Sequence, residues 1–352
     1  RWSDLGIRES TPWCRDRGGT WPARRCRFGP KRLGGPRASG PDLVLPAPVR
    51  ASASPDRSSA RAMEIVRVER EEPDDTAASE LLGPVSSPAQ DAVSFSFTHV
   101  PGAFDQWRAA QETADGLSKW GLDRTLVLEK FRFAGTLDPH ASPESLMLDF
   151  FNDAAVQSAL ATATTGPRQT MASPHGRFQR IDFEPLRTRA LDFHFFARLK
   201  SAEFNVLADS GYLRKCMDEI YDGATACNLL MDLFLNEESE NGSAFSEDER
   251  HELLWVLLRL LTTGGPLSQP EENVQPYYNV LRSFLRALLH VVRDPDAGGV
   301  RSISRAVRVN SLDGSHVGLF PVDNSNNICL LVFTPAHRTV SFLSSGFVPF
   351  FS

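Results

Sequence analysis

The histidines and acidic residues of the chain could bind a metal ion, but they do not form the patterns of common metal centres. His251 and Glu252 begin the HExxH zinc pattern, yet Trp255 stands where the second histidine is required. None of the eight histidines is followed two positions later by Asp or Glu, which argues against a two-histidine, one-carboxylate iron centre. An acidic segment could also bind a cation, and it comprises Glu237, Glu238, Glu240, Glu247, Asp248, Glu249 and Glu252. It lacks the spacing of an EF-hand loop and the central glycine of that loop. We therefore expect a solvated loop and helix entry there, and no metal site.

The sequence patterns of nucleotide binding and of nucleophilic catalysis are also missing. The chain has no GxGxxG, no GxxxxGK followed by Ser or Thr, and no GxSxG. Cys216 and Cys227 could meet His194 or His251 in three dimensions, but buried inert thiols are the commoner outcome. His194 lies in a Phe-rich stretch where we expect a strand and a hydrogen-bonded sheet histidine. We expect no catalytic residue and no cofactor.

One polar stripe is a candidate for docking a protein. Arg282, Arg286, His290 and Arg293 share one side of a helix expected to begin at Pro276. Such a stripe could bind an acidic partner, and the alternative is an ordinary solvated helix face whose last cations are favoured by the helix dipole. Nucleic acid is not an expected partner, because the chain after residue 62 is acidic overall.

The elements that would position these residues are strands, then helices, then strands. Alternating or continuous apolar runs predict strands at 93–100, 125–134, 178–184, 190–198, 300–310, 314–320, 327–333 and 338–343. Apolar spacing predicts helices at 104–119, 145–151, 154–160, 224–235, 246–263 and 276–293, whereas 211–223 is ambiguous. We expect an α+β single domain, with a central block of apolar helices packed against antiparallel strands from the N- and C-terminal parts.

The helix at 246–263 is the strongest single signal. Ser246 and Glu249 form a capping box at its start, and Gly264-Gly265 stops it. Between Leu253 and Leu261 only Arg259 is polar, and a helix that is apolar on nearly every side belongs in the interior of a protein. A charge introduced at Leu254 or Trp255 should therefore be severely destabilising.

Composition excludes several classes of protein. The chain has 352 residues, of which 41% are hydrophobic and 23% charged, values typical of globular proteins. Its longest purely apolar runs are about six residues, far short of the roughly 20 that a membrane span needs. The five cysteines are too few and too scattered for a disulfide scaffold, which favours a reducing compartment, and the absence of a CxxC pair argues against a zinc finger or a redox centre.

The first ninety residues differ from the rest in composition. Residues 1–62 carry 13 Lys or Arg and 5 Asp or Glu, are rich in Pro and Gly, and precede the first methionine, Met63. We expect 1–62 to be disordered and to represent translated upstream sequence, with a targeting segment or a basic nucleic-acid arm as alternatives. The acidic, Ser- and Pro-containing stretch 63–91 should also be disordered, which leaves 92–352 as the folded α+β domain.

An ordered set of short motifs in the second half of the chain resembles one known family. It includes residues 209–222 (DSGYLRKCMDEIYD), the acidic Glu238-Ser239-Glu240, the Phe245-Ser246 helix entry, the Gly264-Gly265 stop, Leu267 to Gln269, and Pro276-Tyr277. LDFFND (148–153) and TPAHRTV (334–340) also fit, and together the set resembles the cilia- and flagella-associated protein 300 family over roughly residues 120–345. The segment just after Met63 and the terminal FVPFFS depart from the pattern.

The resemblance implies a non-enzymatic protein of the cytoplasm and the cilium or flagellum. It implies a role as an assembly factor or transport adaptor for axonemal dynein arms, with dynein subunits or other assembly factors as partners and without membrane insertion. Two alternatives remain at this point, a structural component resident on the axoneme and an unrecognised enzyme. The resemblance supplies no catalytic residue.

Overall fold

A six-stranded antiparallel sheet organises the part of the chain that the computed structural model describes, which is residues 94–137, 142–163, 176–294, 298–315, 319–320 and 322–347. Its strand order is β1-β2-β10-β9-β8-β3. The strands are β1 (Ser96–His99), β2 (Leu126–Ala134), β3 (Ile181–Leu186), β8 (Arg305–Leu312), β9 (Ile328–Thr334) and β10 (Thr339–Ser345). Strands from the two ends of the described region therefore meet at the centre of one sheet, where β2 pairs with β10.

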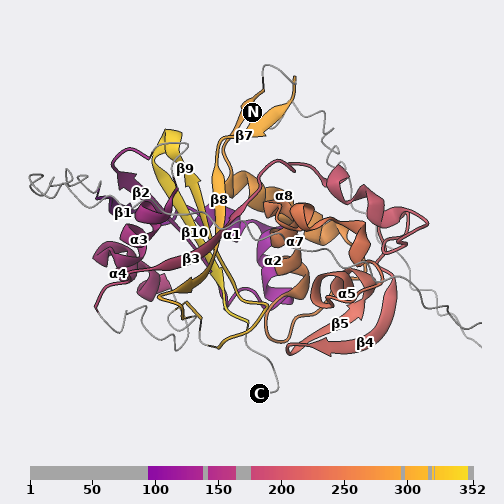
Figure 1. The fold of residues 1–352 in the computed structure, drawn as a ribbon. Coiled ribbons are helices and arrows are strands. Elements are labelled where there is room, and N and C mark those ends of the chain that lie inside the picture. Colours follow the sequence, from indigo (N-terminus) through magenta and orange to yellow (C-terminus); the bar gives the residue numbers. More distant parts are fainter. Residues whose placement is uncertain are drawn as a thin grey trace, which may run out of the picture. The chain divides into compact units, whose positions relative to one another are not determined.

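Both faces of this sheet are covered by helices (Figure 1). In β9 the residues Ile328, Leu330 and Val332 belong to one hydrophobic cluster, and the alternate residues Cys329, Leu331 and Phe333 belong to another. Because successive side chains of a strand point to opposite faces, a strand buried on both faces is apolar at every position. The continuous apolar run in β9 thus reflects a sheet enclosed between two layers.

One layer consists of α3 (Glu144–Asn152) and α4 (Ala154–Ala163). Asp149 of α3 accepts a hydrogen bond from the backbone of Phe95 at 2.8 Å, and Asp153 accepts one from Phe97 at 3.2 Å. Asp153 also caps α4, because its carboxylate accepts from the backbone amides of Ala155 and Val156. These carboxylates satisfy donors on the edge strand β1, which would otherwise be open to pairing with another chain.

The other layer contains the apolar helices. Its elements are α1 (Asp105–Ala109), α2 (Gln111–Lys119), α5 (Leu229–Leu235), α6 (Glu247–Arg250), α7 (Leu253–Thr263) and α8 (Gln275–Leu288). Every residue of α7 except Arg259 is buried, and this confirms the predicted interior helix. The α+β class with helices packed on antiparallel strands from both ends of the chain is also confirmed.

The end of α7 is fixed by a close backbone approach. Gly264 has a φ of +68°, a conformation that side chains other than glycine rarely adopt. A Cβ on Gly265 would lie 2.3 Å from the carbonyl oxygen of Gly121, and the Gly265 amide donates to the Trp120 carbonyl at 2.8 Å. The Gly264-Gly265 stop thus joins α7 to the turn that precedes β2.

Several predicted elements are wrong in type or extent. The predicted strand at 190–198 is a 3-10 helix, η2 (Phe193–Lys200), and the predicted helix at 224–235 begins as β5 (Ala224–Asn228) before α5. The ambiguous segment forms β4 (Lys215–Tyr221), which pairs with β5. The described residues of 314–320 form no strand, and residues 316–318 lie outside the described set.

The predicted helix at 246–263 is two helices, because the backbone of Glu252 is extended. The amide of Arg187 donates to the His251 carbonyl, and that of Leu253 donates to the Arg187 carbonyl, each at 2.8 Å. The buried Glu252 carboxylate accepts from the amides of Arg189 and Ala190, both at 3.1 Å. The segment after β3 thus interrupts the helix by tertiary hydrogen bonding.

The remaining small elements are the hairpin of β6 (Val291–Arg293) and β7 (Val300–Ser302), and the 3-10 turns η3 (Gly242–Ala244) and η4 (Pro335–His337). The turn η4 connects β9 to β10 in an antiparallel hairpin. All described residues belong to one compact unit. The expectations for residues 1–62 and 63–91 lie outside the described residues and stay predictions.

Candidate binding cleft

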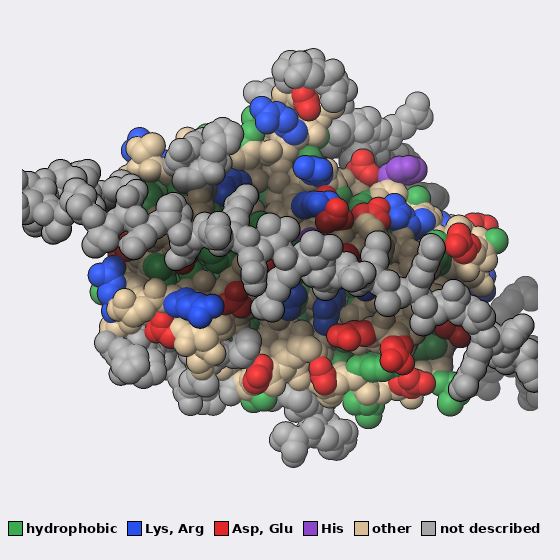
Figure 2. Space-filling view, in the orientation of Figure 1, with side chains coloured by type: hydrophobic (Ala, Val, Ile, Leu, Met, Phe, Trp, Pro, Cys, Tyr) green, Lys and Arg blue, Asp and Glu red, His purple; other side chains and the backbone are tan. Residues whose placement is uncertain are grey.

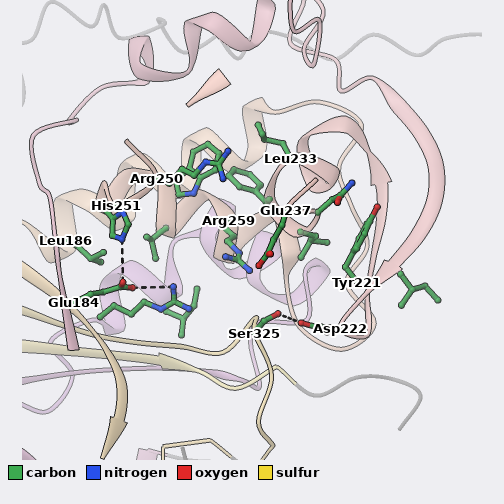
Figure 3. Close-up of a pocket in the computed structure, with 18 residues that line it drawn as sticks. Glu184, Leu186, Tyr221, Asp222, Leu233, Glu237, Arg250, His251, Arg259 and Ser325 are labelled. Carbon is green, nitrogen blue, oxygen red and sulfur yellow. Dashed lines mark hydrogen bonds and ion pairs between the residues drawn. The ribbon is translucent and has the colours of Figure 1, made fainter. Parts of the chain in front are cut away.

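A cleft of about 760 Å³ lies at one end of α7 and beside the β4–β5 hairpin (Figure 3). The sheet contributes β3, β8 and the start of β9, while α5, α6 and α7 form the helical wall. Both sides of the cleft contribute apolar side chains, namely Leu186 and Ile328 from the sheet and Leu233, Phe234, Trp255 and Val256 from the helices. The cleft therefore combines an apolar lining with the charged groups described below.

Glu184 of β3 lies between His251 and Arg308. Its carboxylate oxygens are 3.5 Å from His251 Nε2 and 3.5 Å from a terminal nitrogen of Arg308. Figure 3 shows His251 reaching Glu184 from the helical side of the cleft. At these distances both contacts are loose, so Glu184 holds the sheet and the α6–α7 junction together without a tight bidentate pair.

Arg259 lies in the middle of the cleft between Glu184 and Tyr221 (Figure 3). Its guanidinium donates to Asn326 Oδ1 at 3.2 Å, and among the described residues no carboxylate is within ion-pairing distance of it. Burial lowers the pKa of Arg259 to about 10, with a further contribution from the positive charge of Arg308. The carboxylates of Glu237 and Asp222 act in the opposite direction. Because a pKa of about 10 is well above neutral, Arg259 remains a cation at pH 7.

The β4–β5 hairpin forms the outer rim of the cleft. Asn324 donates to the Asp222 carbonyl at 2.8 Å, and the Ser325 hydroxyl donates to the Asp222 carboxylate, so the hairpin turn is attached to the loop before β9. Ile220 is 70% exposed and Met217 is 82% exposed. Figure 2 shows hydrophobic and acidic side chains gathered at the lower right, over the hairpin region of Figure 1.

The groups that could support catalysis are not brought together in the described part of the chain. Burial raises the pKa of both the Cys216 and Cys227 thiols, whereas a nucleophilic cysteine needs a lowered pKa. His194 is exposed on η2, so its predicted place in a sheet is wrong. Within the described ranges, no group of three His, Cys, Asp or Glu side chains could hold a metal ion, and no helix has the length and apolar character to cross a bilayer.

The predicted docking stripe does not lie on a single helix. Arg282 and Arg286 are on α8, but this helix ends at Leu288, so His290 follows it and Arg293 lies in β6. The Arg282 guanidinium sits over the Phe193 ring, 5.0 Å from its centroid. None of the four residues lines the cleft. Whether they dock a partner remains a prediction.

Sequence reasoning missed the cleft, although it noted Arg259 as the one polar residue of an apolar helix. That exception was a usable signal, because a lone cation in a buried helix must face either a partner or an opening. Arg308, Glu184 and Asp222 carried no comparable signal. They come from separate elements that only the tertiary structure places around Arg259.

The fold and the cleft define the class: an α+β protein with an antiparallel sheet between two helical layers and a cleft lined by charged and apolar side chains. No solved structure matches the chain significantly. The chain belongs to the family described as Cilia- and flagella-associated protein 300, which it matches over residues 94–345. This confirms the resemblance seen in the sequence, and it associates the chain with cilia and flagella.

Two relatives bear the same description. The one from Chlamydomonas reinhardtii is 29% identical over 236 residues, which covers 66% of this chain and 91% of the relative. The one from Paramecium tetraurelia is 24% identical over 229 residues, covering 65% of this chain and 85% of the relative. The matched part of this chain therefore corresponds to most of the length of both relatives.

Proposed function

We propose that the protein is a non-enzymatic assembly factor or transport adaptor for axonemal dynein arms, working in the cytoplasm and the cilium or flagellum. The observation that carries the proposal is membership of a cilium- and flagellum-associated family over residues 94–345. It is supported by a cleft whose lining combines charged and apolar side chains, as in surfaces that bind protein segments. Its partners would be dynein-arm subunits or other assembly factors.

The test is removal of the protein from a ciliated cell followed by quantitative mass spectrometry of isolated axonemes. If the protein is an assembly factor, its removal should deplete dynein-arm subunits from the axoneme. The abundance of tubulin relative to the radial components of the axoneme should stay normal. Re-expression of the full chain should restore the arms. Arms at normal abundance in its absence would contradict the proposal.

Fractionation separates this function from a structural role on the axoneme. An assembly factor or adaptor should be released with the detergent-soluble fraction, because its contact with the axoneme is transient. A resident structural component should stay with demembranated axonemes and dissociate only at high salt. Retention of most of the protein on axonemes would favour the resident component and reject the adaptor.

The residues of the predicted stripe provide a test of a docking face on α8. We expect Arg282→Glu combined with Arg286→Glu to weaken co-purification of dynein-arm subunits at physiological salt, because both replacements reverse the charge presented to an acidic partner. The melting temperature should change little, since Arg286 is exposed and Arg282 is half-buried. Arg301→Glu, on the exposed strand β7, is the matched control. Unchanged co-purification would reject α8 as the docking face.

A further inference from the structure

Arg259 is costly for folding in the structure as it stands. Its guanidinium has five N–H donors, is largely desolvated, and makes one hydrogen bond, to Asn326. The other side chains of α7 are buried and, up to Leu261, entirely apolar. A well-packed aliphatic residue at 259 would avoid the desolvation cost of a charge that has no close counter-ion. The retained cation therefore indicates a role that folding does not explain.

The position of Arg259 makes it available to a ligand. Its side chain lines a cleft of about 760 Å³, which is space for several amino-acid side chains. Arg308 lines the same cleft and is only loosely held by Glu184 at 3.5 Å. Two guanidinium groups facing one cavity can bind a carboxylate through short, charge-assisted hydrogen bonds that strengthen in a desolvated site.

The other lining residues restrict the kind of anion. Asp222 and Glu237 place two carboxylates at the rim and Glu184 lines the cleft as a third, so a polyacidic tract or a multiply charged phosphate would be repelled on entry. Leu186, Leu233 and Trp255 offer apolar contacts around the guanidinium. A ligand complementary to this cleft would carry a single carboxylate surrounded by apolar groups. It would also carry a basic group, placed so that it reaches the carboxylates at the rim when the ligand's carboxylate contacts Arg259. A short protein segment can carry all three features.

We propose that this cleft binds a segment of a partner protein that inserts one Asp or Glu side chain against Arg259. Apolar neighbours of that residue pack on the cleft walls, and a Lys or Arg of the segment pairs with Asp222 or Glu237 at the rim. The exposed Ile220 extends the apolar surface outward from the cleft. The inference rests on the proposed function, because it names the chemistry of the partner segment that an assembly factor would recognise.

The test is selection of random 12-residue peptides, displayed on phage, against the immobilised full chain. We expect enriched peptides with one Asp or Glu flanked by Leu, Ile, Val or Phe. Binding of a synthetic enriched peptide, followed by fluorescence anisotropy, should weaken about tenfold or more with Arg259→Met, as expected for loss of a charge-assisted pair. Changing the peptide's own Asp or Glu to the amide should cause a similar loss, and the two losses should not add. Arg301→Met should leave binding unchanged.

The peptide in which Asp or Glu is replaced by Asn or Gln keeps the test decisive even if Arg259→Met fails to fold, because this change is made in the peptide and the protein stays wild type. Enriched peptides without an acidic residue, or a failure to enrich any peptide above background, would overturn the inference. Equal binding to wild type and Arg259→Met would also overturn it. Displacement of the peptide by inorganic phosphate more readily than by N-acetylglutamate amide would identify a phosphate site instead. Peptide binding with normal dynein arms in the absence of the protein would reject the proposed function alone.

Discussion

Replacement of Leu254 tests whether α7 is the interior helix on which the helical layer packs. The Leu254 side chain is 0% exposed and belongs to the hydrophobic cluster between this layer and the sheet. Changing it to alanine removes three carbon atoms, which at about 0.8 kcal/mol each corresponds to about 2.4 kcal/mol of lost burial. A cavity that neighbouring groups do not refill raises the cost to about 3–5 kcal/mol.

The aspartate variant should be far worse. To keep a buried carboxyl neutral at pH 7 costs about 4 kcal/mol, because its usual pKa of about 3.9 is three units lower and each unit is worth about 1.4 kcal/mol. Added to the lost leucine, this approaches the whole stability of a typical domain, about 5–15 kcal/mol. We expect Leu254→Asp, and likewise Trp255→Asp, to be largely unfolded at pH 7.

The assay is urea unfolding of the full chain followed by circular dichroism, with Leu254→Ala compared with wild type. Met217→Ala is the matched control, because that side chain is 82% exposed and its loss should change stability by no more than about 0.5 kcal/mol. A loss below about 1 kcal/mol for Leu254→Ala, or a folded Leu254→Asp at pH 7, would refute the interior position of α7.

Two further predictions concern a helix cap and a histidine. Ser246→Ala should lower the free energy of unfolding by about 1 kcal/mol, because the hydroxyl accepts from the Glu249 amide and Glu249 accepts in return from Ser246; an unchanged urea midpoint would contradict this. Burial, together with the charges of His337 and Lys130, lowers the pKa of His290. The unfolded chain then binds a proton at a higher pH than the folded protein does, so the wild type loses stability as the pH falls below about 6.5. His290→Asn should reduce this loss of stability between pH 7 and 5. If the melting temperatures of wild type and variant fall equally steeply with pH over this range, the prediction is contradicted.

The sheet shows which features of the fold a local sequence pattern can predict. The alternation in 93–100 and the apolar runs at 125–134 and 327–333 predict strands because a buried strand must be apolar on its covered faces, and all three are confirmed. No local feature predicts that β2 pairs with β10, more than 200 residues away. Strand pairing depends on which surfaces meet after the chain collapses, and that information is spread over both partners.

The errors have a common physical cause. Residues 190–198 are apolar enough for a strand, but Asp192 caps the first turn of η2 by accepting from the His194 amide, and Phe196 packs into the helical layer. The pattern at 246–263 continues through Glu252 as one helix, yet the backbone of Arg187 competes for its hydrogen bonds. In both cases a specific hydrogen bond or packing contact outweighs propensity, which differs by less than about 1 kcal/mol between most residues.

The sequence by itself determined the α+β class, the capping box that begins α6, the interior position and glycine stop of α7, and the family. Each of these depends on residues close together in the chain, or on an ordered set of motifs that needs no coordinates. Only the tertiary structure decided the strand order, the end of α8 before His290, and the cleft. Glu184, Arg259 and Arg308 lie on three different elements, and their charges acquire a shared function only when those elements pack and exclude water from between them.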